Sequence, residues 1–239
     1  MINGSALQLT VIHPTSLIVN LIFSIGNKKC PMKNALISLL EFDKKTYFVF
    51  LCIISFLLLF IKKEFIESEI AAFEVLEAKG EMGMFHVLSA LQFISIPLVY
   101  LFKFTVTAFV IWIGCFMFGY KITYTQLWGI VLVCETIFLL PEVLKIGYFF
   151  LFVGDPNYFD LRAFYPFSML QLTDYTIVSP RYIYPLKALN LFEPIYWVML
   201  VYSVQYTSNK RLNISYYIVF SSYVLLFFLW LGFYIMVYN

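Results

Sequence analysis

The chain has 239 residues, of which 62% are hydrophobic and only 13% are charged, and its formal net charge is +2. A soluble domain carries about a quarter charged residues, so a soluble chain this apolar would have too little polar surface to cover it. Lipid removes that requirement, because the outside of the fold can then be as apolar as the inside. The composition predicts one all-α, polytopic membrane helix bundle, and the small net charge argues against nucleic acid as a partner.

Residues 1–33 are expected to form an N-terminal arm, or to precede a true initiator at Met32. Their apolar runs are broken by His13 and Pro14 and have no basic region before them, so they make a poor signal peptide and are too short for a span. Residues 34–239 are predicted to be the membrane domain. It opens with an amphipathic helix over 34–42 that lies at the interface.

The first predicted span is 46–61, with two lysines on either side whose stems can reach the interface. The following segment, 62–80, is predicted to be an amphipathic helix outside the membrane. Its apolar residues recur at three- and four-residue steps between glutamates, which fits a solvated acidic face or a surface that docks a partner. These apolar residues are Phe65, Ile66, Ile70, Phe73 and Leu76.

The apolar stretch 86–118 is longer than a hydrocarbon core of about 30 Å requires. It forms either one tilted helix, kinked at Pro97, or two short spans that turn near Lys103. No glycine, asparagine or second proline marks a turn at Lys103, so one helix is favoured. Further spans are predicted near 126–153, 183–206 and 214–238, which gives five membrane helices, with six as the alternative.

The distribution of lysine and arginine favours an N-terminus inside and a C-terminus outside, because this orientation places more of these residues on the inner side. In a bacterium the membrane would be the cell inner (cytoplasmic) membrane.

Ionisable residues inside predicted spans are costly and are often paired or functional, and here they are Lys103, Glu135, Glu142 and Lys145. If the turn after the second span centres near residue 122, Lys103 lies 19 residues before it and Glu142 lies 20 after it. Equal depth predicts that these two side chains approach each other, with Glu135 nearer the turn. The cluster is interpreted as a structural ion pair or as a proton or ion pathway.

A second polar site is expected at Glu193, beside Pro194 in the fourth predicted span, where a proline frees backbone carbonyls. No standard catalytic motif is present: the sequence has no HExxH, no GxSxG and no glycine-rich phosphate loop. With two isolated histidines, a zinc site is not expected either. The sequence therefore predicts no catalytic residue, no cofactor and no metal.

The stretch 103–146, which includes TAFVIWIGCFMFGYKITYTQLWGIVLVCETIFLLPEVLKI, resembles the Yip (Ypt-interacting protein) superfamily of small five-span membrane proteins. As in that family, a long apolar helix ends at a glycine, Gly119, and a short polar turn with Tyr124 and Gln126 follows. The next span then carries Pro141 near its middle. The loop before the fourth span is longer than is usual in that family. The resemblance implies a non-enzymatic scaffold or adaptor in membrane trafficking or secretion.

Three functions are expected in this order. The first is an integral-membrane accessory or scaffold subunit that binds protein partners, as in protein transport, through its spans or the 62–80 helix. The second is a small transporter or channel that uses Lys103, Glu135, Glu142 and Lys145. The third is a membrane-embedded lipid-modifying enzyme, for which the loop with Asp155, Asp160, Arg162 and Asp174 is the source of polar groups.

Overall fold

The computed structural model describes residues 43–64, 82–152, 158–173, 175, 177–208 and 211–238. These residues are almost entirely helical. Several predictions lie outside them: the N-terminal arm, the interfacial helix 34–42, and the five apolar residues proposed to dock a partner. Asp155 and Asp174 of the polar loop also lie outside.

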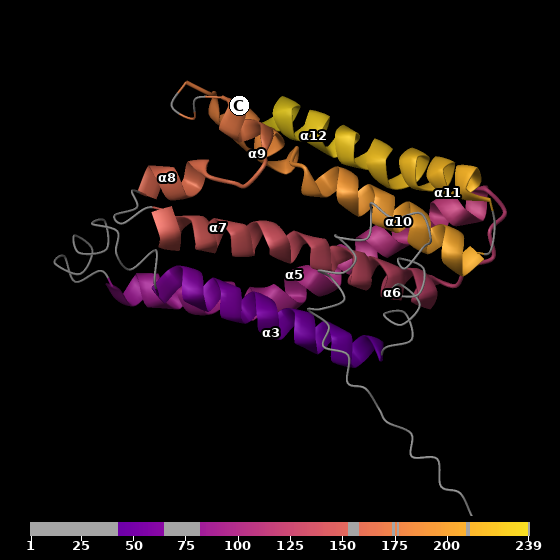
Figure 1. Ribbon diagram of the computed structural model, residues 1–239, viewed down its shortest axis with the longest axis horizontal. Coiled ribbons are helices and arrows are strands. Elements are labelled where there is room, and N and C mark those ends of the chain that lie inside the picture. The colour runs from indigo at the N-terminus through magenta and orange to yellow at the C-terminus, as the bar shows by residue number, and fades with distance from the viewer. Residues whose placement is uncertain are drawn as a thin grey trace, which may run out of the picture. The chain divides into compact units, whose positions relative to one another are not determined.

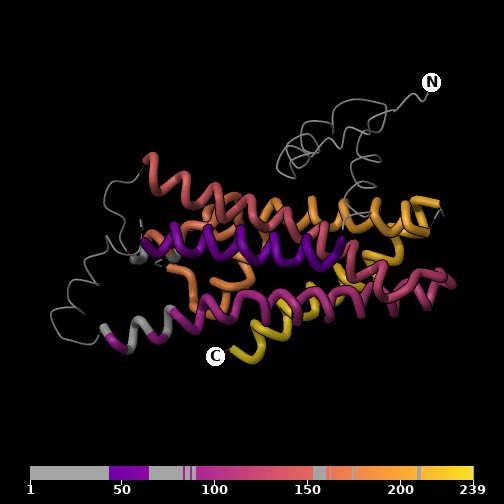
Figure 2. Tube along the Cα trace, turned by 90° about the horizontal axis from the view of Figure 1, so that it is seen from below, coloured from indigo at the N-terminus to yellow at the C-terminus, as the bar shows by residue number. Residues whose placement is uncertain are grey.

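Four helical stretches in the described part of the chain are long and apolar enough to cross a membrane, judged by length and composition. They are Lys44–Lys62, Ala90–Met117, Tyr124–Phe152 and Leu212–Val237. Each overlaps a predicted span, and the all-α membrane helix bundle predicted from composition is confirmed. The long helices run beside one another in both views (Figures 1 and 2).

The second span is one helix, α5 (Met82–Met117), which passes through Lys103 without a turn and contains Pro97. Its 36 residues extend about 54 Å, more than a hydrocarbon core of about 30 Å. The helix ends at Met117, and Gly119 two residues later has a φ of 73°, in the left-handed region. There the amide of Tyr120 donates to the carbonyl of Cys115 at 2.8 Å, which closes the helix as glycine-terminated helices commonly do.

The third span is the central helix of the bundle. It consists of α6 (Tyr124–Glu135), the 3₁₀ turn η3 (Thr136–Phe138) and α7 (Leu139–Phe152). Within its most apolar window 61% of the residues are buried, compared with 11% for α3 (Lys44–Lys62). It packs against α3, α5 and α10 (Phe192–Ser208). Groups that the bundle buries are therefore carried mainly by this helix.

The structure divides the predicted span over 183–206 into α9 (Pro180–Ala188) and α10. Asn190 lies in the break, where its Oδ1 accepts hydrogen bonds from the amides of Phe192 and Glu193 at 2.9 and 3.2 Å. Asparagine is a strong helix N-cap, and Pro194 is tolerated in the first turn because its missing N–H has no intrahelical partner there. A fifth span, formed by the 17 residues of α10, stays a prediction.

The last span is interrupted by a π-helical turn. It consists of α11 (Leu212–Val219), the π segment η5 (Phe220–Val224) and α12 (Leu225–Val237). In the π segment the Ser222 hydroxyl donates to the carbonyl of Ile218 at 2.6 Å. Single π turns inside α-helices are frequent at functional sites.

The first span is capped by Asp43, whose carboxylate accepts a hydrogen bond from the Thr46 hydroxyl at 2.8 Å. This hydrogen bond lowers the pKa of Asp43 below its ordinary value. A lowered pKa means that the cap stabilises the helix above the ordinary carboxyl pKa and that this contribution is lost as the pH falls through the lowered value. We therefore expect acidification to speed amide hydrogen exchange at Thr46 and Tyr47 in the wild type. The control is Asp43→Asn, in which a neutral side-chain amide caps the helix at every pH and the exchange should not respond to loss of a charge. Equal exchange ratios across the acidic range would contradict this expectation.

Candidate functional site

The centre of the candidate site is an ion pair between helices α5 and α6. Lys103 Nζ donates a hydrogen bond to Glu135 Oε1. The Glu135 side chain is 2% exposed, whereas that of Lys103 is 43% exposed. The Lys103 ammonium also lies over the ring of Phe138, 4.6 Å from its centroid. The pair thus joins a buried carboxylate to a lysine that is partly accessible.

The prediction that Lys103 approaches Glu142 is wrong in its choice of carboxylate, and two features explain the difference. Lys103 lies 14 residues before the end of α5 at Met117, and the residue 14 positions after the start of α6 at Tyr124 is Phe138. Glu135 and Glu142 therefore lie on either side of the level of Lys103. The 3₁₀ turn between them winds at 3.0 residues per turn and rotates the chain by about 60° more than an α-helix would.

A second carboxylate, Glu193, lies close to this pair. It occupies the first turn of α10, directly after the break at Asn190, and is 9% exposed. Both Lys103 and Glu135 act on it electrostatically. The sequence predicts two separate polar sites, one with Lys103 and Glu135 and one at Glu193. In the structure these residues belong to one cluster.

Several polar atoms of this cluster have no hydrogen-bond partner. Among the described residues, seven buried side-chain nitrogen or oxygen atoms are unpaired, and four of them lie here. These four are Glu135 Oε2, Glu193 Oε2, Tyr196 Oη and Trp197 Nε1. Tyr196 lies beside Glu135 and Trp197 beside Glu193, so each carboxylate faces one of these donors, at a separation or angle outside the usual range of a hydrogen bond. Since buried polar groups are nearly always well paired, this concentration makes the cluster the strongest candidate for a functional site among the described residues.

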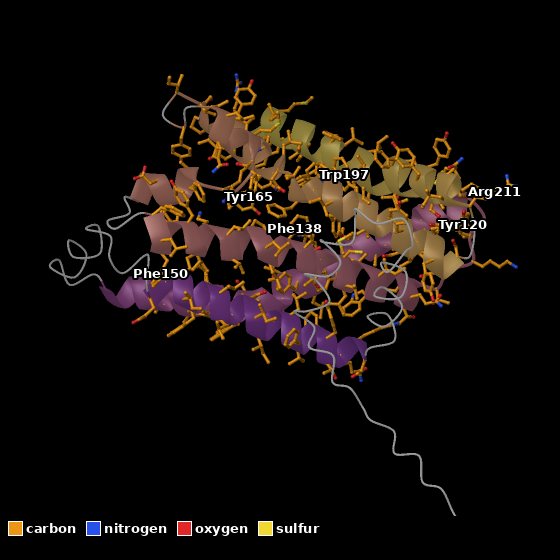
Figure 3. The ribbon with its side chains drawn as sticks, in the orientation of Figure 1. Tyr120, Phe138, Phe150, Tyr165, Trp197 and Arg211 are labelled. Atoms are coloured by element: carbon orange, nitrogen blue, oxygen red, sulfur yellow. The ribbon has the colours of Figure 1, made fainter. Side chains whose placement is uncertain are left out.

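Three irregular turns of the helices surround the cluster. Glu135 immediately precedes the 3₁₀ turn η3, Glu193 follows the break between α9 and α10, and Tyr223 belongs to the π segment η5. The ring of Tyr223 lies 5.4 Å from that of Tyr196, which in turn lies 5.1 Å from Phe138. Figure 3 shows Phe138, Tyr165 and Trp197 near the middle of the helices, whereas Phe150 and Arg211 lie toward opposite ends.

Glu142 lies in a groove between α3, α5 and α7 that has a volume of about 340 Å³. The groove shares Phe138 with the cluster, and its wall includes Tyr100, one turn before Lys103. The Tyr100 and Ser55 hydroxyls are hydrogen-bonded at 2.7 Å. The remaining polar residues that line it are Lys62 and Ser95. On the side of the bundle where α3 packs, the groove thus borders Phe138, whose ring lies against the Lys103 ammonium.

Lys145 does not join the cluster that the sequence predicted. Its ammonium donates to the carbonyl oxygen of Leu161, in α8 (Tyr158–Ala163), at 2.6 Å, and the side chain is 4% exposed. Leu161 forms a small apolar core with Phe149 beside it. Lys145 therefore fastens α8 to α7. Asp160, in the same short helix, is exposed.

Sequence reasoning missed the two tyrosines that complete the cluster. Tyr196 lies three residues after Glu193 and therefore on the same helical face, a signal that could have found it. Tyr223 offered no such signal, because it is placed by a π turn that local sequence does not mark. Within the described ranges, no group of three or more His, Cys, Asp or Glu side chains could hold a metal ion.

The fold and the site define an all-α membrane helix bundle with a buried cluster of charged and tyrosine side chains at three irregular turns. Comparison with protein-family models, with characterised proteins and with solved structures finds no match. The resemblance to the Yip superfamily therefore stays a prediction.

Proposed function

We propose that this protein is a small membrane transporter or channel that passes charge through the cluster of Lys103, Glu135 and Glu193. The observation that carries the proposal is the buried ion pair with a second carboxylate beside it, where two carboxylate oxygens have no hydrogen-bond partner. Ionisable residues at membrane depth are costly, and those that persist commonly serve ion or proton pathways. A purely structural ion pair would need only Lys103 and Glu135.

The irregular backbone around the cluster supports the same proposal. Inside a bilayer, non-helical backbone is tolerated only where protein buries it or where it lines a water-filled cavity. The break at Asn190 and the π turn at Tyr223 both border the cluster. The groove that contains Glu142 is the proposed entry to the pathway, so Glu142 stays among the pathway residues that the sequence predicts. In the proposed pathway Glu193 replaces Lys145. We propose a multi-pass orientation with the N-terminus inside and the C-terminus outside, in the cell inner membrane if the source is a bacterium.

The test is charge movement in proteoliposomes adsorbed to a solid-supported membrane. Full-length protein is exposed in turn to steps of pH, Na⁺ and K⁺, and the transient current is recorded. We expect a current from the wild type for one of these ions and none from Glu193→Gln, which keeps the shape of the side chain but cannot carry a charge. Asp160→Asn, which neutralises an exposed carboxylate on α8, should retain the wild-type current.

Two results would contradict the proposal. The first is that correctly folded wild type gives no current above that of empty vesicles for any of the three ions. The second is that Glu193→Gln carries the full current, in which case the charge does not pass through the cluster.

The second candidate is the accessory or scaffold subunit, which one observation favours. Helix α3 presents a row of exposed apolar side chains, among them Ile53, Phe56, Leu57 and Phe60, and is largely unburied by the rest of the described chain. Such a face contacts lipid or another membrane protein. Extraction of tagged protein in mild detergent, followed by mass spectrometry, distinguishes the two: a stoichiometric partner supports the accessory subunit, and a lone monodisperse protein argues against it.

A further inference from the structure

The cluster has an imbalance of charge. Lys103 contributes one ammonium, while Glu135 and Glu193 contribute two carboxylates, so the fully ionised cluster carries one net negative charge. An uncompensated charge away from water is expensive, and in proteins it is usually neutralised by a partner or by a proton. The cluster therefore needs one more positive charge.

No other cation of the described chain supplies that charge. The charged side chains that act on Glu193 are Lys103 from α5 and Glu135 from α6. The ammonium of Lys145 is held at the carbonyl of Leu161, and that of Lys187 lies over the ring of Tyr165, 5.1 Å from its centroid. The remaining titratable groups of the described chain that face the cluster carry no positive charge: they are Cys134 and the tyrosines at positions 100, 165, 196 and 223.

The unpaired atoms indicate where the missing charge is bound. Lys103 is bonded directly to Glu135, so that carboxylate is already balanced. Glu193 is at least nine-tenths buried, and its Oε2 has no hydrogen-bond partner. The indole N–H of Trp197 beside it is a donor only and brings no charge.

We propose that the missing charge is a proton bound to Glu193, and that this proton is the one the pathway exchanges. An O–H bond forms on the Glu193 carboxylate with a proton taken from water, and the same bond breaks on release, with no redox partner. A single proton is favoured over a metal cation because the described residues have no group of three or more His, Cys, Asp or Glu side chains that could hold a metal ion. The inference rests on the proposed function, since it names the ion that the pathway passes.

Infrared spectroscopy of the full-length protein in lipid bilayers tests this proposal. A protonated carboxylic acid has a C=O stretching band that is resolved from carboxylate bands and shifts in heavy water. At neutral pH we expect one such band from the wild type and from Asp160→Asn, and its loss in Glu193→Gln. Glu193→Asp should keep a band at a shifted position, which separates loss of the proton from loss of the fold.

Three outcomes would overturn the proposal: no such band in the wild type at neutral pH, an unchanged band in Glu193→Gln, or loss of the band on addition of Na⁺ or K⁺ at constant pH, which would assign the site to a metal cation. Failure of this inference can be told apart from failure of the proposed function. A band without any current refutes transport and leaves the bound proton in place, whereas a current without a band refutes the bound proton.

Discussion

Replacement of Lys103 by methionine is expected to lower the free energy of unfolding by about 3 kcal/mol, because it leaves Glu135 buried without its cation. Breaking a buried ion pair by removing one partner costs roughly 3–5 kcal/mol. The lower end applies here, since Lys103 is partly exposed and Glu135 can take up a proton when its partner is lost. The measurement is reversible unfolding in mixed micelles with increasing denaturing detergent.

The control is Lys121→Met, which removes an exposed lysine from the connection after α5 and should change stability little. The double variant Lys103→Met, Glu135→Met should recover most of the loss, because an apolar pair of similar volume often replaces a buried ion pair without cost. Equal stability of Lys103→Met and Lys121→Met would contradict this expectation, because loss of the Lys103 ammonium would then leave no buried charge uncompensated.

The second large effect is expected for Gly114→Leu, at the contact between α5 and the last span. A Cβ atom at Gly114 would lie 2.9 Å from both Cβ and Oγ of Ser222 and 3.3 Å from Cγ2 of Ile218. Small residues at such contacts allow membrane helices to approach closely. A leucine would force the helices apart, and overpacking of this kind costs about 2 kcal/mol. The same unfolding measurement applies.

Gly232→Leu is the matched control, because it places the same side chain in a helix of the same span where nothing lies within 4 Å of the added Cβ. It should leave stability near that of the wild type. Because leucine has the higher helix propensity, equal losses in the two variants would mean that the contact with Ser222 does not set the cost. The displacement is also expected to disturb the π turn that positions Tyr223, so Gly114→Leu should reduce the current as well.

The spans could be predicted where the sequence is uniformly apolar and bounded by charge, as in α3 and the last span. The prediction that one helix passes through Lys103 is confirmed. It could be made because no turn-forming residue occurs near Lys103. Interruptions of the fourth predicted span were expected at Pro185 and at Glu193–Pro194, because proline removes a helical hydrogen bond, whereas the break lies at Asn190 between them. Asparagine competes for backbone hydrogen bonds and marks a helix start only when the following residues form a first turn.

The site was predicted in its residues more than in its geometry. Lys103, Glu135, Glu142 and Glu193 were singled out because charge inside a span is conspicuous. Their grouping depends on the rotation of the chain at η3 and on the packing of α10 against α6. Neither can be predicted from the spacing of residues along a regular α-helix. Lys145 was assigned to the cluster on spacing alone, although the carbonyl it binds belongs to a segment far along the chain.

The central claim is that the cluster carries charge and does not merely hold helices together, and the current through Glu193→Gln tests it most directly. Glutamine is neutral, like the protonated Glu193, and the variant leaves the Lys103–Glu135 pair in place, so its resistance to unfolding should match that of the wild type. We predict that such a stable variant passes no current under an ion gradient that drives one through the wild type. A stable Glu193→Gln protein with an undiminished current would contradict the account.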